Sequence, residues 1–147
     1  MIIWGNHSKT QFPDTFNAAI GSDCLREVMS DKLEWLDGDF LARVQNRGGE
    51  IISVMGKSSA ASAANAVCDH VRDLHHGTGS RRVSMAVLSD GNSFGIPEGI
   101  FYSFPVKIQD GDWTIENEEF EINDFMRERL DASATELIEE RTMAFAE

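Results

Sequence analysis

The stretch Met1-Ile2-Ile3-Trp4-Gly5-Asn6-His7 is the most informative part of this chain for its fold and its chemistry. A short apolar run stopped by Gly-Asn predicts a buried strand that leads into a turn. This arrangement would place His7 at the carboxyl edge of a sheet, where α/β enzymes gather their reactive groups. Imidazole exchanges protons near neutral pH, so His7 is the first candidate for acid–base chemistry. The alternative is a polar side chain in a surface loop.

The next third of the chain predicts helices more clearly than strands. Residues 8–30 have weak periodicity and predict a loop followed by an ill-defined helix. Apolar residues spaced three and four apart predict a helix over 31–47, which Gly48-Gly49 would end. The apolar run over 50–55 then predicts a short strand.

A second helix is predicted over residues 60–75. Ser58 and Ser59 precede it and can cap its free amide groups. A helix start also favours a negatively charged group, although capping alone is the simpler interpretation. The apolar stripe of this helix is formed by Ala60, Ala64, Val67, Val71 and Leu74. Many residues of the helix are alanine, and such small side chains suit close packing against another helix or subunit.

The second half of the chain predicts an antiparallel sheet followed by a helix. Strand-like stretches occur at 83–88, 100–108 and 113–115, and Asp110-Gly111 suits a tight hairpin between the last two. Asn123-Asp124 predicts the start of the last helix, with a cap residue and an acid at the positive end of the helix dipole. The expected fold class is therefore α+β, with antiparallel sheet segments and long packed helices in one domain over 1–147.

Net charge, cysteine count and the length of apolar stretches limit the binding partners and the cellular setting that we expect. The net charge of −12 argues against nucleic acid and against an anionic membrane surface, because both need a basic face. Two cysteines, Cys24 and Cys68, are too few for a secreted disulfide scaffold and indicate a reduced, cytosolic setting. No apolar stretch approaches the length that spans a membrane.

Several other motifs predict no site. His70, His75 and His76 share a helix with Cys68, but Cys68 and His70 point to different helix faces, so no metal is expected. Gly56-Lys57-Ser58 ends like a phosphate-binding loop, yet Ile51 stands where that loop needs glycine.

Two further stretches are interpreted as structural. Gly77-Thr78-Gly79 lacks the third glycine of a dinucleotide fingerprint and precedes a strand, which indicates a turn. The acids at 116–121 and 136–140 are interpreted as solvated faces.

Taken in order, separate blocks resemble the C-terminal half of the cytosolic-type malate dehydrogenases, in the lactate/malate dehydrogenase family. They cover nearly the whole chain: residues 2–8 with Thr10, Gln11 and Pro13-Asp14, residues 56–64, 68–73, 83–85, 89–93, 102–106 and 122–125. The resemblance implies a cytoplasmic, NAD-dependent enzyme that interconverts malate and oxaloacetate, usually as a homodimer. The substrate would be a small dicarboxylate.

The resemblance also implies residue roles. His7 matches the family's catalytic histidine, which exchanges the hydroxyl proton. Ser59 matches a serine that orients substrate or the nicotinamide of NAD, and Ser58 is its neighbour. The dinucleotide-binding domain, the aspartate that orients the histidine and the arginines that clamp the dicarboxylate would lie upstream of Met1. The isolated chain is therefore expected neither to bind NADH tightly nor to turn over oxaloacetate.

Two alternatives stay open at this point. One is a lactate dehydrogenase of malate-type ancestry that acts on another 2-keto acid, because the loop that chooses between substrates would lie upstream. The other is a non-catalytic dimerising module, which the alanine-rich helix over 60–75 would suit.

Overall fold

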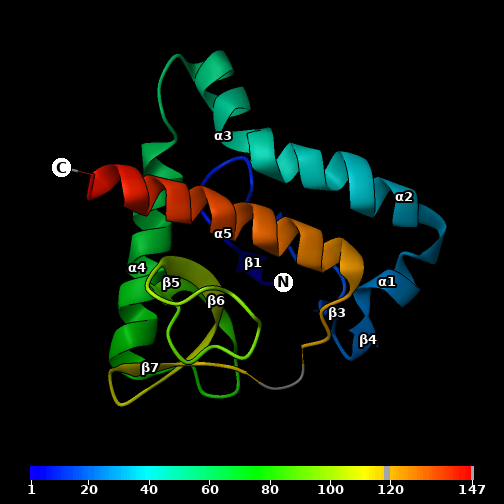
Figure 1. The fold of residues 1–147 in the computed structure, drawn as a ribbon. Helices are drawn as coiled ribbons and strands as arrows, with labels where there is room; N and C mark the ends of the chain where they lie inside the picture. Colours follow the sequence, from blue (N-terminus) through cyan, green and yellow to red (C-terminus); the bar gives the residue numbers. More distant parts are fainter. Residues whose placement is uncertain (118–119, 147) are drawn as a thin grey trace.

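A three-stranded antiparallel sheet with long helices beside it forms the centre of the molecule (Figure 1). The computed structural model describes residues 1–117 and 120–146. The sheet has the order β5 (Val83–Leu88), β6 (Phe101–Gln109) and β7 (Asp112–Ile115). The long helices are α3 (Leu41–Met55), α4 (Ala60–His76) and α5 (Asp124–Ala144). This architecture confirms the α+β class.

The remaining elements are short and lie in the first forty residues. β1 pairs with β2 and β3 pairs with β4, both antiparallel. Their bounds and those of the short helices are β1 Ile3–Trp4, β2 Phe12–Pro13, β3 Ala19–Ile20, β4 Asp23–Cys24, α1 Leu25–Val28 and α2 Leu33–Trp35. Residues 8–30, expected to be loop and weak helix, thus form small ribbons and one helical turn.

The central strand β6 buries every second side chain on one face, and Pro105 on the opposite face is buried too. Tyr102, Phe104, Val106 and Ile108 are buried, as the period of two along a strand requires. The Asp110-Gly111 hairpin that joins β6 to β7 is confirmed, and both its residues have positive φ (55° and 85°), as a type I′ turn requires.

Helix α5 packs its apolar stripe against the residues of β6. Its predicted start is confirmed, because the side chain of Asn123 accepts a hydrogen bond from the backbone N–H of Met126 at 2.9 Å. Met126 and Leu130 are fully buried in the same core cluster as Tyr102. The Tyr102 hydroxyl donates to the carbonyl of Leu130 at 3.2 Å. Burial raises the pKa of this phenol, which therefore stays a donor.

The predicted helix end at Gly48-Gly49 and the predicted strand over 50–55 are wrong. A helical run continues from α2 through a π-helical segment, Leu36–Phe40, into α3, which ends only at Met55. Each interior glycine costs about 1 kcal/mol relative to alanine, which weakens a helix without ending it. The stop is Gly56, whose φ of 70° supplies the left-handed cap.

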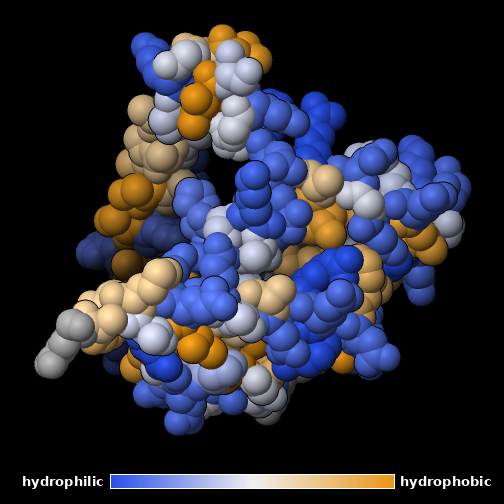
Figure 2. Space-filling model, turned by 45° about the horizontal axis from the view of Figure 1, so that its top comes forward, coloured by the Kyte–Doolittle hydropathy of each residue, from blue (hydrophilic) through white to orange (hydrophobic). Residues whose placement is uncertain are grey.

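The predicted helix over 60–75 is confirmed as α4, but its stripe of Ala60, Ala64, Val67, Val71 and Leu74 is exposed. Figure 2 shows hydrophobic residues gathered along the exposed side of this helix. The predicted cap is wrong for Ser59: it precedes the helix, but its hydroxyl accepts no hydrogen bond from a helix amide. That hydroxyl contacts the hydroxyl of Ser62 instead.

Strand β1 is fastened to β6 immediately before the turn that carries His7. Gly5 and Ser103 exchange two backbone hydrogen bonds, of 3.2 and 2.9 Å. The Ser103 hydroxyl also donates to the carbonyl of Ile3 at 2.7 Å. Next to Gly5, the fully buried Trp4 indole packs edge-on against Phe94, with ring centroids 4.9 Å apart.

Gly5 lies directly against helix α5. Its φ is +93°, and a Cβ built there would lie 2.2 Å from Oγ and 2.8 Å from Cβ of Ser133. Both the backbone conformation and the contact therefore require glycine. This close approach sets the distance between the end of β1 and the helix.

We expect Gly5→Ala to destabilise the fold by about 2–4 kcal/mol, because the substitution adds a steric overlap to an unfavourable φ. Urea denaturation followed by circular dichroism measures the loss.

The matched control is Gly21→Ala. Gly21 also has a positive φ (63°), but nothing lies within 4 Å of the position that an alanine Cβ would take there. It should lose only about 1 kcal/mol, the conformational cost alone. Equal losses in the two variants would show that contact with Ser133 is unimportant.

Candidate functional site

The candidate site is the loop between β1 and β2, which carries His7. The His7 side chain is exposed and lines a cavity of about 270 Å³. It is thus accessible, and not enclosed in the apolar core. The other described residues that line this cavity are Ser8, Lys9, Gln11, Gln45, Asn46, Gly48 and Gly49.

The hydroxyl groups that flank this part of the loop bind one carboxylate of α5. Ser8 and Thr10 both donate to Oε2 of Glu136, at 2.6 and 2.5 Å. Between them, Lys9 is exposed and lines the cavity together with His7. Ser8 and Thr10 are therefore bound to the helix, whereas the basic side chains of His7 and Lys9 stay accessible.

A second helix residue, Ser133, completes the attachment. Its buried hydroxyl accepts the backbone N–H of Asn6 at 2.8 Å and lies 2.9 Å from Oγ1 of Thr10. About two turns further along α5, Glu140 accepts a hydrogen bond from the Asn6 side chain at 3.2 Å. The residues on both sides of His7 are thus hydrogen-bonded to α5.

The far end of the loop is held by α3. The side-chain amide of Gln45 donates to the backbone carbonyl of Gln11 at 3.0 Å. Because α3 continues past residue 47, Gly48 and Gly49 line the His7 cavity. The cavity therefore lies between the loop and a helix that the sequence pattern ended too early.

In the segment after the loop, the buried carboxylate of Asp14 accepts several hydrogen bonds from neighbouring residues. Asp14 is 1% exposed and accepts the Trp4 indole N–H at 3.1 Å. It also accepts the backbone N–H groups of Phe16 and Asn17, each at 2.9 Å, and the Asn17 side-chain amide. A buried charge with this many donors is compensated and orders the chain around it.

The two predicted serines are not brought into this cavity. Ser58 is exposed and Ser59 half-buried at the start of α4, and neither is among the residues that line the cavity of His7. Their predicted contact with substrate or cofactor stays a prediction.

The interpretation of residues 136–140 and 116–121 as solvated faces is wrong for specific members. Glu136 is half-buried and binds the His7 loop, and Glu116 pairs with Lys107, whereas Glu139 and Glu140 are exposed as expected. Residues 118–119 lie outside the described part of the chain. The signal that could have been used is polar spacing: Ser133, Glu136 and Glu140 recur at three and four on one helix face.

The structure offers no competing metal or membrane element in the residues it describes. Within 1–117 and 120–146, no group of three or more His, Cys, Asp or Glu side chains could hold a metal ion. His70 instead contacts the carbonyl of Ser84 through Nε2 at 3.1 Å. The same residues include no helix that is long and apolar enough to cross a bilayer.

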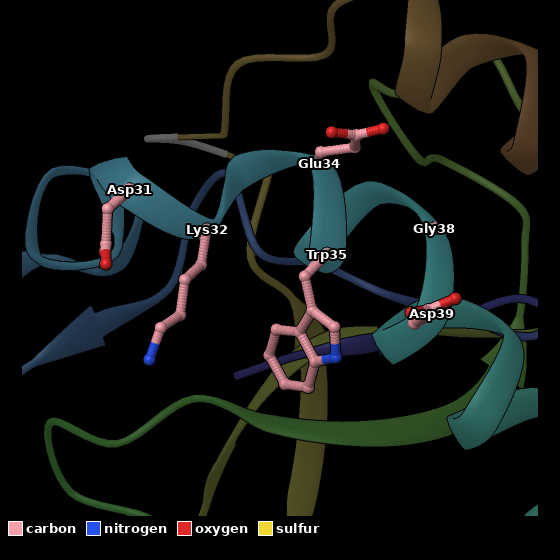
Figure 3. A pocket seen from close by; sticks show the side chains of 6 residues that line it. All are labelled: Asp31, Lys32, Glu34, Trp35, Gly38 and Asp39. Atoms are coloured by element: carbon pink, nitrogen blue, oxygen red, sulfur yellow. The ribbon is translucent and has the colours of Figure 1, made fainter.

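A separate pocket of about 440 Å³ lies beside α2 (Figure 3). The Lys32 and Trp35 side chains extend to the same side, whereas Glu34 points away from them. Its lining includes three carboxylates, which disfavours an anion: Asp31, Glu34 and Asp39. None of the predicted site residues lines it.

The attachment of Glu136 predicts a pH-dependent stability. Partial burial raises the pKa of Glu136, but hydrogen bonds from Ser8, Thr10 and Asn6 together hold it below its ordinary value. A lowered folded-state pKa adds stability above the unfolded pKa, and this contribution is lost as pH falls through the folded one.

We therefore expect Glu136→Gln to cost about 1–2 kcal/mol at pH 7, with the difference from wild type shrinking as the pH falls below 4.5. Urea denaturation at a series of pH values measures it. Glu139→Gln, an exposed neighbour on α5, should change stability by no more than about 0.5 kcal/mol. A pH-independent loss in Glu136→Gln would contradict the expectation.

Comparison with known proteins shows which family the chain belongs to. All 147 residues match the lactate/malate dehydrogenase α/β C-terminal domain. The chain is 49% identical over 150 aligned residues to cytoplasmic malate dehydrogenase of Bos taurus and 50% identical over 149 to that of Gallus gallus. The alignments cover 99% and 98% of this chain but 44% of each relative, so it spans less than half their length.

Solved structures agree. Malate dehydrogenase from Naegleria fowleri superposes with a TM-score of 0.85 at 44% identity, over 95% of this chain and 42% of that one. Trichomonas vaginalis lactate dehydrogenase in complex with NADH and oxamate gives a TM-score of 0.89 at 28% identity, over 97% and 44% of the two chains. The chain with the tethered His7 loop thus belongs to the lactate/malate dehydrogenase family, of which it represents the α/β C-terminal domain.

Proposed function

We propose that this chain is the substrate-side half of a cytoplasmic, NAD-dependent malate dehydrogenase in which His7 is the acid–base residue. The observation that carries the proposal is the placement of His7: it is exposed, lines a cavity, and sits in a loop fastened to α5 on both sides. The malate dehydrogenases among its relatives support the substrate class.

His7 suits the proton transfer that this reaction needs. Oxidation of malate removes a hydride from carbon and a proton from the hydroxyl group. Imidazole accepts that proton near neutral pH and returns it in the reverse direction. Because neighbouring residues hold the loop backbone, the ring can be aimed without burying it.

The cavity chemistry favours an anionic substrate. Lys9 lies next to His7 along its lining, and none of the described lining residues carries a carboxylate. A 2-keto dicarboxylate would find an ammonium group there, with the amides of Gln45 and Asn46 as hydrogen-bonding groups. The closer sequence identity to malate dehydrogenases, against 28% to the Trichomonas vaginalis lactate dehydrogenase, favours oxaloacetate over a monocarboxylate.

NAD would supply the hydride acceptor when bound. The described residues fit only its reactive end: the partly exposed Ser59 at the start of α4 could contact the nicotinamide. The glycine-rich turn Gly77-Thr78-Gly79 precedes β5, and its Thr78 hydroxyl accepts a hydrogen bond from the backbone N–H of Ile108. Most of the cofactor would therefore be held by a dinucleotide-binding half supplied separately.

We expect His7→Ala to lower kcat for oxaloacetate reduction by about 10²–10⁴-fold, the usual contribution of a general acid–base residue. The assay follows NADH oxidation after the chain is fused to, or mixed with, the nucleotide-binding half of a malate dehydrogenase.

The same assay contains its controls. His76→Ala changes an exposed histidine that does not line the cavity of His7 and should leave kcat unchanged. The 147-residue chain alone should neither bind NADH tightly nor turn over oxaloacetate. Faster turnover of pyruvate than of oxaloacetate would favour a lactate dehydrogenase, and full activity in His7→Ala would refute the proposed role.

We also propose that the exposed face of α4 pairs with a second copy of the chain. Val67 and Val71 lie one turn apart on α4 and are 62% and 59% exposed. Together with the small side chains of the same stripe they form an apolar surface of the kind that dimers bury. This homodimer is also what a non-catalytic module would need, so it does not depend on activity.

Val71→Glu should raise the dimer dissociation constant at least about tenfold, because it places a charge in an apolar contact. Sedimentation velocity over a concentration series measures it. Val28→Glu, the same change at a 49% exposed valine on α1, should leave the dimer intact. A wild-type chain that stays monomeric at high concentration would rule the pairing out.

A further inference from the structure

We propose that Glu136 of α5 is a positioning residue for His7: its carboxylate fixes the direction of the hydrogen bonds that hold the His7 loop. The inference rests on the proposed function only for the consequence on catalysis. The attachment itself can be measured without activity. Neither the sequence pattern nor the relatives' names assign a role to this residue.

The first step is a count of hydrogens. An ionised carboxylate only accepts hydrogen bonds, and the hydroxyl groups of Ser8 and Thr10 both donate to Glu136. With both hydrogens used in this way, the 2.9 Å contact between the Ser8 and Thr10 hydroxyl oxygens carries no hydrogen of its own. The contact between Thr10 and Ser133 then has one possible direction, with the Ser133 hydroxyl as donor. Ser133 is left to accept the backbone N–H of Asn6, as its geometry shows.

The same reasoning fixes the backbone on the other side of His7. The Ser8 hydroxyl donates to Glu136, so its oxygen is free to accept the N–H of Thr10, which lies 3.0 Å away. Each hydrogen in the set is thus used once. A neutral group in place of the carboxylate could donate as well as accept, and the direction of the set would no longer be determined.

The second step concerns where these bonds act. They hold Asn6 and Ser8, the immediate neighbours of His7. The preceding residue, Gly5, already lies against Ser133, so the chain cannot move closer to α5 at this point. His7 lines the cavity next to Ser8, whereas Glu136 is not among the residues described as lining it. Glu136 therefore controls the placement of the ring through the backbone, without touching a reacting atom.

Hydrogen–deuterium exchange on the 147-residue chain tests the attachment. In Glu136→Gln, the hydrogen-bonded amides of Asn6 and Thr10 should exchange at least about tenfold faster, while those of β6 keep their wild-type rates. Glu139→Gln makes the same charge change on α5 and should leave the loop unchanged. Thr10→Val, which removes one donor and keeps the shape, should loosen the loop partially. Wild-type exchange in Glu136→Gln would overturn the proposal.

Kinetics with the nucleotide-binding half test the consequence for His7. A misplaced catalytic group lowers turnover, so Glu136→Gln should reduce kcat about ten- to a hundredfold and leave KM for NADH within about twofold. Unchanged kcat with a loosened loop would overturn the positioning role. An inactive wild-type assembly would instead overturn the proposed function, while the exchange rates would still decide whether Glu136 holds the loop.

Discussion

The contact of Gly5 with Ser133 is the constraint on which the arrangement of the site depends. With no side chain on Gly5, the end of β1 approaches α5 closely enough for the Asn6 backbone to reach the Ser133 hydroxyl. The Gly5 backbone is at the same time bonded to Ser103 in β6. One residue thereby joins the sheet, the helix and the candidate catalytic loop, and a shift in any of them would move His7.

This constraint explains why the loop is held by polar groups. Helix α5 uses one side, through Met126, Leu130 and Ala134, for the apolar core. The same part of α5 also presents Ser133 and Glu136, which hydrogen-bond to the loop. Apolar contacts there would pull the loop inward and bury the imidazole. Hydrogen bonds fix the backbone at a set distance and leave His7 and Lys9 exposed.

The sequence predicted the parts of this fold that are governed by local rules. The Asp110-Gly111 hairpin depends on φ at two residues, and the Asn123 cap depends on one side-chain hydrogen bond. The error at Gly48-Gly49 has a different cause, because a short apolar run fits a strand or a helix and only the flanking context decides. Glu136 could not be assigned from its own segment, since its partners lie more than 120 residues away in the chain.

The exposed stripe of α4 and the His7 loop differ in whether they need a partner. Val67 and Val71 gain stability only when another surface covers them, since alone they leave apolar area in water. The His7 loop is already ordered by bonds within the described residues. A partner that packs on α4 therefore does not need to organise the histidine. None of the described residues that line the His7 cavity belongs to α4, so the pairing surface and the candidate catalytic loop are separate parts of the fold.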